Sequence, residues 1–101
     1  MNFLELIVGK KVNLQEVISN GAVILDVRTK LEYQSGHLKN SINIPVDNLS
    51  QNIKKLNKNK PIITCCASGA RSASARRILK SNGFEQVYNG GSWYSLRKYT
   101  V

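Results

Sequence analysis

The sequence has no long hydrophobic run, few acidic residues, one histidine and only two cysteines. Apolar runs reach about six residues, whereas a membrane-spanning helix needs roughly 20, so no transmembrane helix is predicted. The apolar segment 3–8 is interrupted by Glu5 and lacks the basic start and the small-residue cleavage site of a signal peptide. In the absence of an export signal, we expect a cytoplasmic protein that has no membrane partner.

The scarcity of cysteine and histidine limits the chemistry that the chain can support. Cys65 and Cys66 are adjacent, and neighbouring cysteines form a disulfide only through a strained ring, so we predict two free thiols. Together with His37, they are too few for a zinc site. We therefore expect neither a metal ion nor another cofactor, and free thiols in a reducing compartment are either core residues or reactive groups.

The shortage of acidic residues leaves 15 lysines and arginines against 6 aspartates and glutamates, a net charge of +9. Such a charge suits a solvated surface, and it also attracts small anions, acidic proteins or nucleic acid. No nucleic-acid-binding motif accompanies it, so no nucleic-acid partner is expected. With 101 residues, 42% of them hydrophobic, the chain is long enough for one domain with a core of its own, which we assign to residues 1–101.

Apolar segments and helical segments alternate along the chain. Strands are predicted at residues 22–27, 41–44, 61–66 and 84–88. Capping signals and apolar spacing predict helices at residues 13–21, 29–36, 46–56, 72–82 and 92–99, and Gly90 and Gly91 predict a tight turn. This alternation predicts an α/β fold with a parallel sheet between helices, in which ligands bind at the carboxyl ends of the strands.

The end of the 61–66 strand carries the candidate site. Cys66 is followed by small residues and then by a helix, so its thiol would face the positive end of the helix dipole and unpaired backbone N–H groups. These groups favour a thiolate and would also bind an anion beside it. The alternative is that Cys66 is a small core residue, but the loop and the arginine favour a catalytic nucleophile. The predicted substrate-binding residues are Ala67, Ser68, Gly69, Ala70, Arg71 and Ser72.

Several motifs in this order resemble the single-domain rhodanese family, over residues 13 to 95. The active-site loop of that family is matched by Cys66-x-x-Gly69-x-Arg71-Ser72. The amino-terminal signature is matched by Ile24-Leu25-Asp26-Val27-Arg28, Glu32-Tyr33-x-x-Gly36-His37 and Asn43-Ile44-Pro45. The last strand and turn are matched by Gly83-Phe84 and Tyr88-Asn89-Gly90-Gly91.

The resemblance implies a three-layer α/β/α rhodanese-like fold with a central, mainly parallel, five-stranded sheet. It implies a sulfurtransferase in which Cys66 takes sulfane sulfur from a small anionic donor such as thiosulfate and carries it as a persulfide. The acceptor would be cyanide or a thiol, protein thiols included. Arg71 would help to hold the anionic donor.

The remaining residues of the resemblance carry over as structure rather than chemistry. The structural signature comprises Asp26, Arg28, Glu32 and His37. Arg28 and Glu32 can pair at the first strand–helix junction, and His37 can satisfy backbone groups. The chain departs from the family pattern at Asn40, where glycine is usual and where asparagine tolerates the left-handed conformation. It also departs at Trp93, in the motif that follows the last turn.

Two other functions remain open. Counted from Cys65, the loop reads Cys-x5-Arg, the signature of tyrosine phosphatases and arsenate reductases, which would make Cys65 the nucleophile. A non-catalytic rhodanese-like module that docks with a partner is the second alternative. Side chains alternate along a strand, so Cys65 should point away from the loop and act as a packing residue. The competing hypothesis is that Cys65 resolves or protects an oxidised Cys66.

Overall fold

Asn13 and Thr29 begin the first two helices of the structure, a computed structural model that describes residues 12–100. The Asn13 side chain caps α2 (Leu14–Ser19) by accepting the Glu16 backbone N–H at 3.1 Å. Thr29 caps α3 (Lys30–Gln34) in a complete capping box with Glu32, whose carboxylate accepts the Thr29 backbone N–H at 2.9 Å. The polar spacing in the sequence therefore predicts both helix starts correctly.

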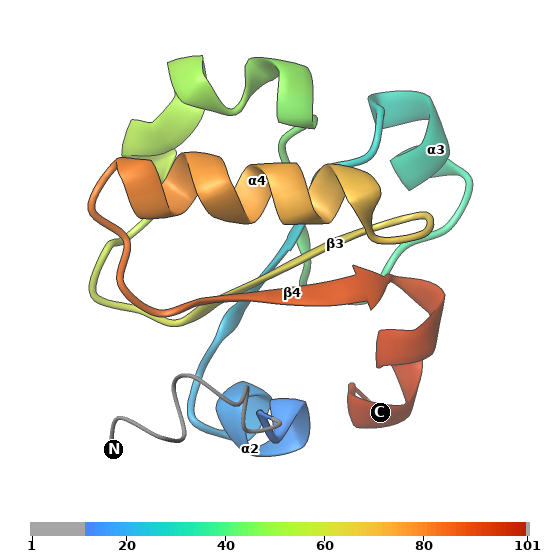
Figure 1. The fold of residues 1–101 in the computed structure, drawn as a ribbon. Helices are drawn as coiled ribbons and strands as arrows, with labels where there is room; N and C mark the ends of the chain where they lie inside the picture. Colours follow the sequence, from blue (N-terminus) through green and yellow to red (C-terminus); the bar gives the residue numbers. More distant parts are fainter. Residues whose placement is uncertain (1–11, 101) are drawn as a thin grey trace.

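The apolar segments form a parallel sheet in the order β2-β1-β3-β4 (Figure 1). Its strands are β1 (Val23–Asp26), β2 (Ile42–Asn43), β3 (Ile62–Cys66) and β4 (Val87–Ser92). The α/β class is confirmed, but residues 12–100 contribute four strands rather than five. Within this range the four predicted apolar segments account for all of the strands, and the fifth strand depended on the resemblance alone.

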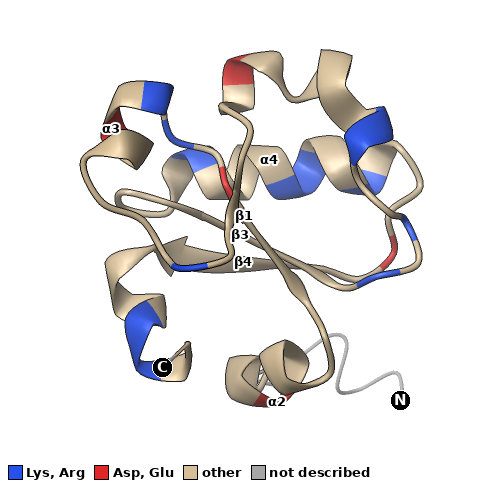
Figure 2. Cartoon of the chain, turned by 180° about the vertical axis from the view of Figure 1, so that it is seen from behind, with Lys and Arg blue, Asp and Glu red and all other residues tan. Residues whose placement is uncertain are grey.

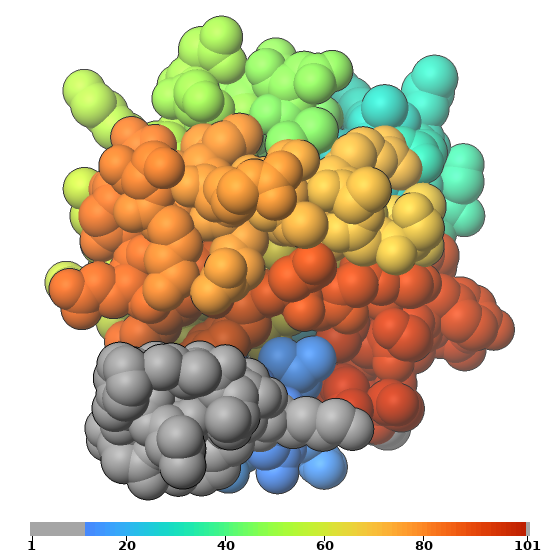
Figure 3. Space-filling model, viewed as in Figure 1, coloured from blue at the N-terminus to red at the C-terminus, as the bar shows by residue number. Residues whose placement is uncertain are grey.

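Helices cover both faces of the sheet, in three layers (Figure 1). One face carries α4 (Ala70–Ser81) with η1 (Val46–Asn48) and η2 (Ser50–Lys55), and α4 runs across the middle of this side in Figure 3. The other face carries α2 and η3 (Tyr94–Tyr99). None of the helices within residues 12–100 is long and apolar enough to cross a membrane.

The predicted helix at 46–56 is replaced by the two 3₁₀ helices η1 and η2. Val46 and Leu49, and again Ile53 and Leu56, are three residues apart, which matches the three residues per turn of a 3₁₀ helix. Leu49 is fully buried, and all four side chains lie in or against the core on the α4 side of the sheet. The apolar spacing therefore predicts the buried side correctly but not the type of helix.

The core consists of two apolar clusters, one on each face of the sheet. Alternation along β3 divides its residues between them: Ile62 and Cys66 lie in the cluster beneath α4, whereas Ile63 and Cys65 lie in the cluster beneath α2 and η3. All five residues of β3 are buried, as expected for the strand in a parallel sheet that helices cover on both faces.

The predicted turn at Gly90 and Gly91 is wrong, because both residues lie within β4. The β3–β4 register shifts between Thr64 and Cys66, and Gly91 adopts a φ of +76°, so β4 continues through a bulge until Ser92 pairs with Cys66. A Cβ at Gly90 would lie 2.7 Å from the Ile63 side chain. Glycine is thus required there by close packing against β3.

Candidate functional site

Cys66 is the last residue of β3, and only a three-residue loop separates it from α4. Gly69 caps that helix with a φ of +115°, a conformation that side chains disfavour. The loop therefore turns back sharply, which places the first turn of α4 beside the Cys66 sulfur. The thiol itself is buried, with 1% of the residue exposed.

The backbone of the loop directs N–H groups at the Cys66 Sγ atom, as the sequence predicts for an anion nest. Gly69 donates its N–H to Sγ at 3.0 Å, and Ser72 donates its N–H at 3.4 Å. The Ser72 Oγ lies 3.5 Å from the same sulfur. Donors that converge on one atom stabilise negative charge on that atom.

The pKa of Cys66 reflects a competition between burial and these donors. Burial of the thiol acts to raise the pKa, because it disfavours the charged form. Hydrogen bonds from the Ser72 hydroxyl and from the backbone N–H groups of Ser72, Gly69 and Ser68 act in the opposite direction and outweigh it. The pKa of Cys66 is lowered as a result, which makes the thiolate more accessible near neutral pH.

The predicted substrate-binding residues occupy this loop, although they contribute in different ways. Ala67, Ser68 and Ala70 are exposed around the nest and have short side chains that leave it open. Gly69 and Ser72 provide the N–H groups that contact the sulfur.

Arg71 makes its contact outside the nest. Its Nη1 and Nη2 groups donate to the two Glu32 carboxylate oxygens at 2.7 and 3.0 Å. This ion pair ties the first turn of α4 to α3. Glu32 therefore has a pKa lowered to about 2, chiefly because of the Arg71 hydrogen bonds and also because of the Thr29 backbone N–H. The Arg71 charge is partnered by a carboxylate, so the negative charge of a ligand in the nest would be met mainly by N–H groups.

Arg28 and Glu32, which the sequence suggests can pair, meet only at the backbone, where Arg28 Nη1 donates to the Glu32 carbonyl at 3.4 Å. Arg28 instead donates from Nε and Nη2 to the Asp26 carboxylate at 2.9 and 2.7 Å, and both residues are buried. Arg28 Nη2 also donates to the Gly36 carbonyl at 2.8 Å, and its guanidinium lies 4.5 Å from the centre of the Trp93 ring. Arg28 therefore joins the end of β1 to the segment after α3 and gives Trp93 a defined packing partner.

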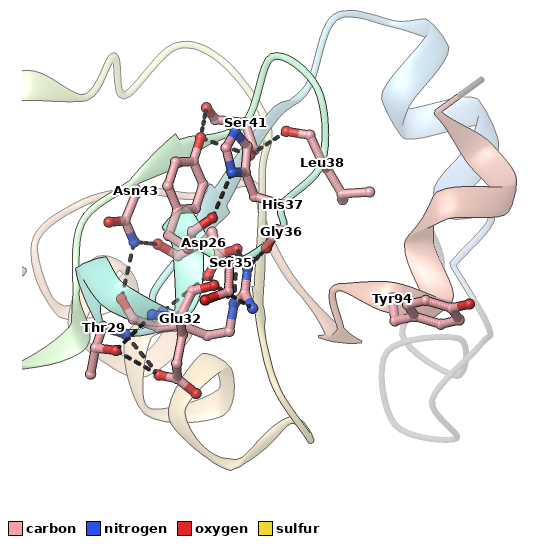
Figure 4. Close-up of polar contacts among 12 residues, drawn as sticks. Asp26, Thr29, Glu32, Ser35, Gly36, His37, Leu38, Ser41, Asn43 and Tyr94 are labelled. Atoms are coloured by element: carbon pink, nitrogen blue, oxygen red, sulfur yellow. Dashed lines mark hydrogen bonds and ion pairs between the residues drawn. The ribbon is translucent and has the colours of Figure 1, made fainter.

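Figure 4 shows this polar network, with Glu32 bonded to Thr29 in the capping box. His37 lies at its edge, where Nδ1 is 2.7 Å from the Tyr33 carbonyl and the two rings are stacked 3.7 Å apart. The expected role of His37 in satisfying a backbone group is thus observed. Asn40 has a φ of 66°, which confirms the left-handed turn that the sequence predicts there.

Cys65 points to the opposite face from Cys66, as strand alternation predicts. It is fully buried, and burial followed by the neighbouring Asp26 charge raises the pKa of its thiol to about 12. A thiol with this pKa stays protonated at neutral pH. The geometry therefore argues against Cys65 as the nucleophile of a Cys-x5-Arg phosphatase.

Asn89 is a site contact that sequence reasoning missed. It was grouped with the glycines of the last motif, yet its side chain reaches from β4 to the Cys66 loop, where Oδ1 accepts from the Ser72 hydroxyl at 2.6 Å. The available signal was its position: a polar residue directly after the strand predicted at 84–88, although the structure extends β4 to Ser92.

A groove of about 760 Å³ lies away from the nest, between α3 and the helices η1 and η2, and Cys66 is not among its lining residues. Within residues 12–100, no three histidine, cysteine, aspartate or glutamate side chains are grouped as a metal ion would require. The nest around Cys66 is therefore the strongest candidate site by its chemistry rather than by its size.

Comparisons with known proteins agree with this fold. The model of the family described as "Rhodanese-like domain" matches residues 11–94. The chain is 31% identical over 86 residues to the thiosulfate sulfurtransferase GlpE of Pseudomonas savastanoi pv. phaseolicola (strain 1448A / Race 6), covering 85% of this chain and 81% of that protein. It superimposes on a rhodanese-related protein from Thermoplasma volcanium with a TM-score of 0.72 and 33% identity, covering 84% of this chain and 83% of the other.

A third relative is matched over a smaller share of its own length. The Bacillus subtilis (strain 168) protein YrkF is 39% identical over 66 residues, which are 65% of this chain but only 36% of YrkF. Domains of this kind therefore also occur within longer proteins.

Proposed function

The chain belongs to the family of rhodanese-like domains, and from that premise we propose that it is a sulfurtransferase that carries sulfur on Cys66 as a persulfide. The observation that carries the proposal is the pair of backbone N–H groups, from Gly69 and Ser72, that converge on the Cys66 Sγ atom at 3.0 and 3.4 Å. These donors favour the thiolate, which is the nucleophilic form of cysteine.

Thiosulfate is the donor that we propose for the first step. The Cys66 thiolate attacks the outer sulfur of thiosulfate and forms a new S–S bond. The bond between the two thiosulfate sulfurs breaks, and sulfite leaves with its electron pair. The product is a persulfide anion on Cys66, and the loop N–H groups that contact Sγ would help to stabilise the charge of the adjoining outer sulfur.

In the second step an acceptor regenerates the enzyme. The acceptor is cyanide or the thiolate of a small molecule or a protein. It attacks the outer sulfur of the persulfide and takes that sulfur away. The electron pair of the broken S–S bond returns to Cys66. Neither step needs a resident metal ion or cofactor in this scheme. Both cysteines are unbridged, which suits a reducing compartment such as the cytoplasm.

The proposal is tested by intact-protein mass spectrometry after incubation with thiosulfate. We expect a gain of one sulfur atom on Cys66, removed by cyanide with formation of thiocyanate. The Cys65→Ala variant should gain the same adduct and the Cys66→Ala variant none. A wild-type protein that stays unmodified would contradict transfer from thiosulfate and favour a non-catalytic domain, and an adduct on Cys65 would contradict the assigned nucleophile.

A further inference from the structure

The Asn89 side chain connects β4 to both residues whose N–H groups contact the Cys66 sulfur. Asn89 is the third residue of β4, in register with Thr64, which lies two residues before the end of β3. Its amide leaves the sheet on the α4 side, where Cys66 also points. A residue on a neighbouring strand thus meets the active loop from the side opposite α3.

Three hydrogen bonds hold the amide in one orientation. Oδ1 accepts the Gly91 N–H at 2.9 Å and the Ser72 hydroxyl at 2.6 Å, and Nδ2 donates to the Gly69 carbonyl at 3.3 Å. The Gly91 contact fixes the amide to the bulge of β4. The other two contacts fix Gly69 and Ser72 to the amide, and these residues donate the backbone N–H groups that lie 3.0 and 3.4 Å from Sγ.

Ser72 has one hydroxyl hydrogen and several atoms that can accept it. The Ser72 Oγ atom lies 2.6 Å from Asn89 Oδ1, 3.0 Å from the Gly69 carbonyl and 3.5 Å from Cys66 Sγ. When Cys66 is a thiol, its S–H donates to Ser72 Oγ and the hydroxyl donates to Asn89. When Cys66 is a thiolate, the hydroxyl can turn to the sulfur, while the amide keeps its bonds to the Gly91 N–H and the Gly69 carbonyl and so continues to hold Gly69, whose N–H contacts Sγ.

We propose that Asn89 is a positioning residue, whose amide ties the Gly69 carbonyl to the bulge of β4 and so holds the loop with its Gly69 and Ser72 N–H groups directed at the Cys66 sulfur. The residue touches neither Sγ nor any reacting atom, and it acts through the two residues that do. This inference rests on the proposed function for its catalytic meaning, but its effect on Cys66 is measurable without a sulfur donor.

Two substitutions test whether the hydrogen bonds of the Asn89 amide, rather than the space that the side chain fills, affect Cys66. Asn89→Asp keeps the size and both acceptor contacts, but it replaces the Nδ2 donor with an oxygen that faces the Gly69 carbonyl and adds negative charge beside the nest. Asn89→Ala removes all three contacts without adding charge. Asn82→Ala is the matched control, because Asn82 is an exposed asparagine that donates to Ile78 O at the other end of α4.

The measurement is the pH dependence of Cys66 alkylation by iodoacetamide, with the modified cysteine located by mass spectrometry and the fold checked by circular dichroism. We expect the alkylation midpoint to rise by about half a pH unit in Asn89→Ala and by about one unit in Asn89→Asp, the scale of one hydrogen bond to a charged group. Asn82→Ala should leave the midpoint at the wild-type value.

A wild-type midpoint in folded Asn89→Ala would overturn the proposal, because that variant removes all three contacts without adding charge. Turnover supplies a second readout: the loss of kcat/KM for thiosulfate in Asn89→Asp should be largest below the alkylation midpoint and partly recovered above it. A loss that is the same at every pH would mean that Asn89 does not act on the ionisation of Cys66. If the wild-type protein accepts no sulfur at all, the proposed function fails while the alkylation profile still decides the role of Asn89.

Discussion

The face of the sheet beneath α4 and the face beneath α2 and η3 each receive one thiol from the end of β3. Both thiols are buried, with Cys65 at 0% and Cys66 at 1% exposure. On the α4 side, a helix start and a tight loop direct N–H groups at Cys66 and lower its pKa. On the other side, burial in the apolar cluster raises the pKa of Cys65 to about 12.

This contrast shows that burial alone does not decide how a thiol behaves. Burial acts to raise the pKa of both cysteines. The difference comes from the donors, because unpaired N–H groups at the start of α4 replace the water that a thiolate loses. A strand that ends against a helix start on one face only can therefore carry one reactive and one inert cysteine side by side.

The reactive thiol lies on one face of the sheet, whereas the charged residues are spread over several elements. Lysines and arginines lie on helices and connections at both ends of the sheet, whereas acidic residues are few (Figure 2). Near the nest, the Arg71 charge is balanced by Glu32. The local attraction for an anion is therefore supplied by the loop backbone, with the net charge of +9 adding a general field.

The largest effect is expected from exchanging the reactive thiol. Cys66→Ser should lower the rate of thiocyanate formation from thiosulfate and cyanide by about a thousandfold or more, because a hydroxyl does not form a persulfide. Cys65→Ala should keep the rate within about threefold of wild type, because a buried methyl group replaces a buried, neutral thiol. Unchanged circular dichroism confirms that both variants are folded. A reversal of the two rates would move the nucleophile to Cys65.

The same pair of variants also tests whether Cys65 protects the active thiol. After brief peroxide exposure and reduction, we expect Cys65→Ala to recover as much activity as the wild type, since the two side chains point to opposite faces. Poor recovery in the variant alone would show that Cys65 acts as a resolving thiol.

An intermediate effect is expected on stability at alkaline pH. The pKa of Cys65 is raised in the folded state, from an ordinary 9.0 to about 12. The contribution of the buried, neutral thiol to the free energy of unfolding is therefore fully present below pH 9 and is lost as the pH rises from 9 towards 12. Cys65→Ala should remove this loss, about 1 kcal/mol by pH 10. Urea unfolding at pH 8 and pH 10 measures it, and Cys66→Ala is the control, because the pKa of Cys66 shifts in the opposite direction. Equal alkaline losses in wild type and Cys65→Ala would contradict the raised pKa.

The smallest effect is expected from the ion pair that joins α3 to the active loop. The pKa of Glu32 is lowered from an ordinary 4.5 to about 2, so the pairing stabilises the fold above pH 4.5 and is lost as the pH falls towards 2. Its side chains are 36% and 38% exposed, so solvent screening limits the contribution to about 1 kcal/mol or less. Arg71→Ala should lose less stability than wild type over that acid range in urea unfolding.

The same variant tests whether Arg71 also holds the donor. Because Glu32 already pairs with the guanidinium, we expect Arg71→Ala to change KM for thiosulfate only a fewfold, with a similar change for an uncharged sulfur donor. A selective loss with thiosulfate would show that Arg71 leaves Glu32 to bind the anion during turnover.

Local patterns in the sequence by themselves determined the alternation of strands and helices, the caps at Asn13 and Thr29, and the position of Cys66 at a strand end before a helix. They also determined that Cys65 and Cys66 point to opposite faces. These features depend on neighbours within a few residues, through capping hydrogen bonds and the two-residue repeat of a strand.

Only the tertiary structure decided which distant side chains meet. Arg71 pairs with Glu32, 39 residues away, and Asn89 reaches Ser72 across 17 residues. Spacing along the chain carries no information about such contacts, because they depend on how β3, β4 and α3 are placed in space. The bulge at Gly90 and Gly91 was decided in the same way, since Gly90 packs closely against Ile63 and the β3–β4 register shifts before Ser92 pairs with Cys66.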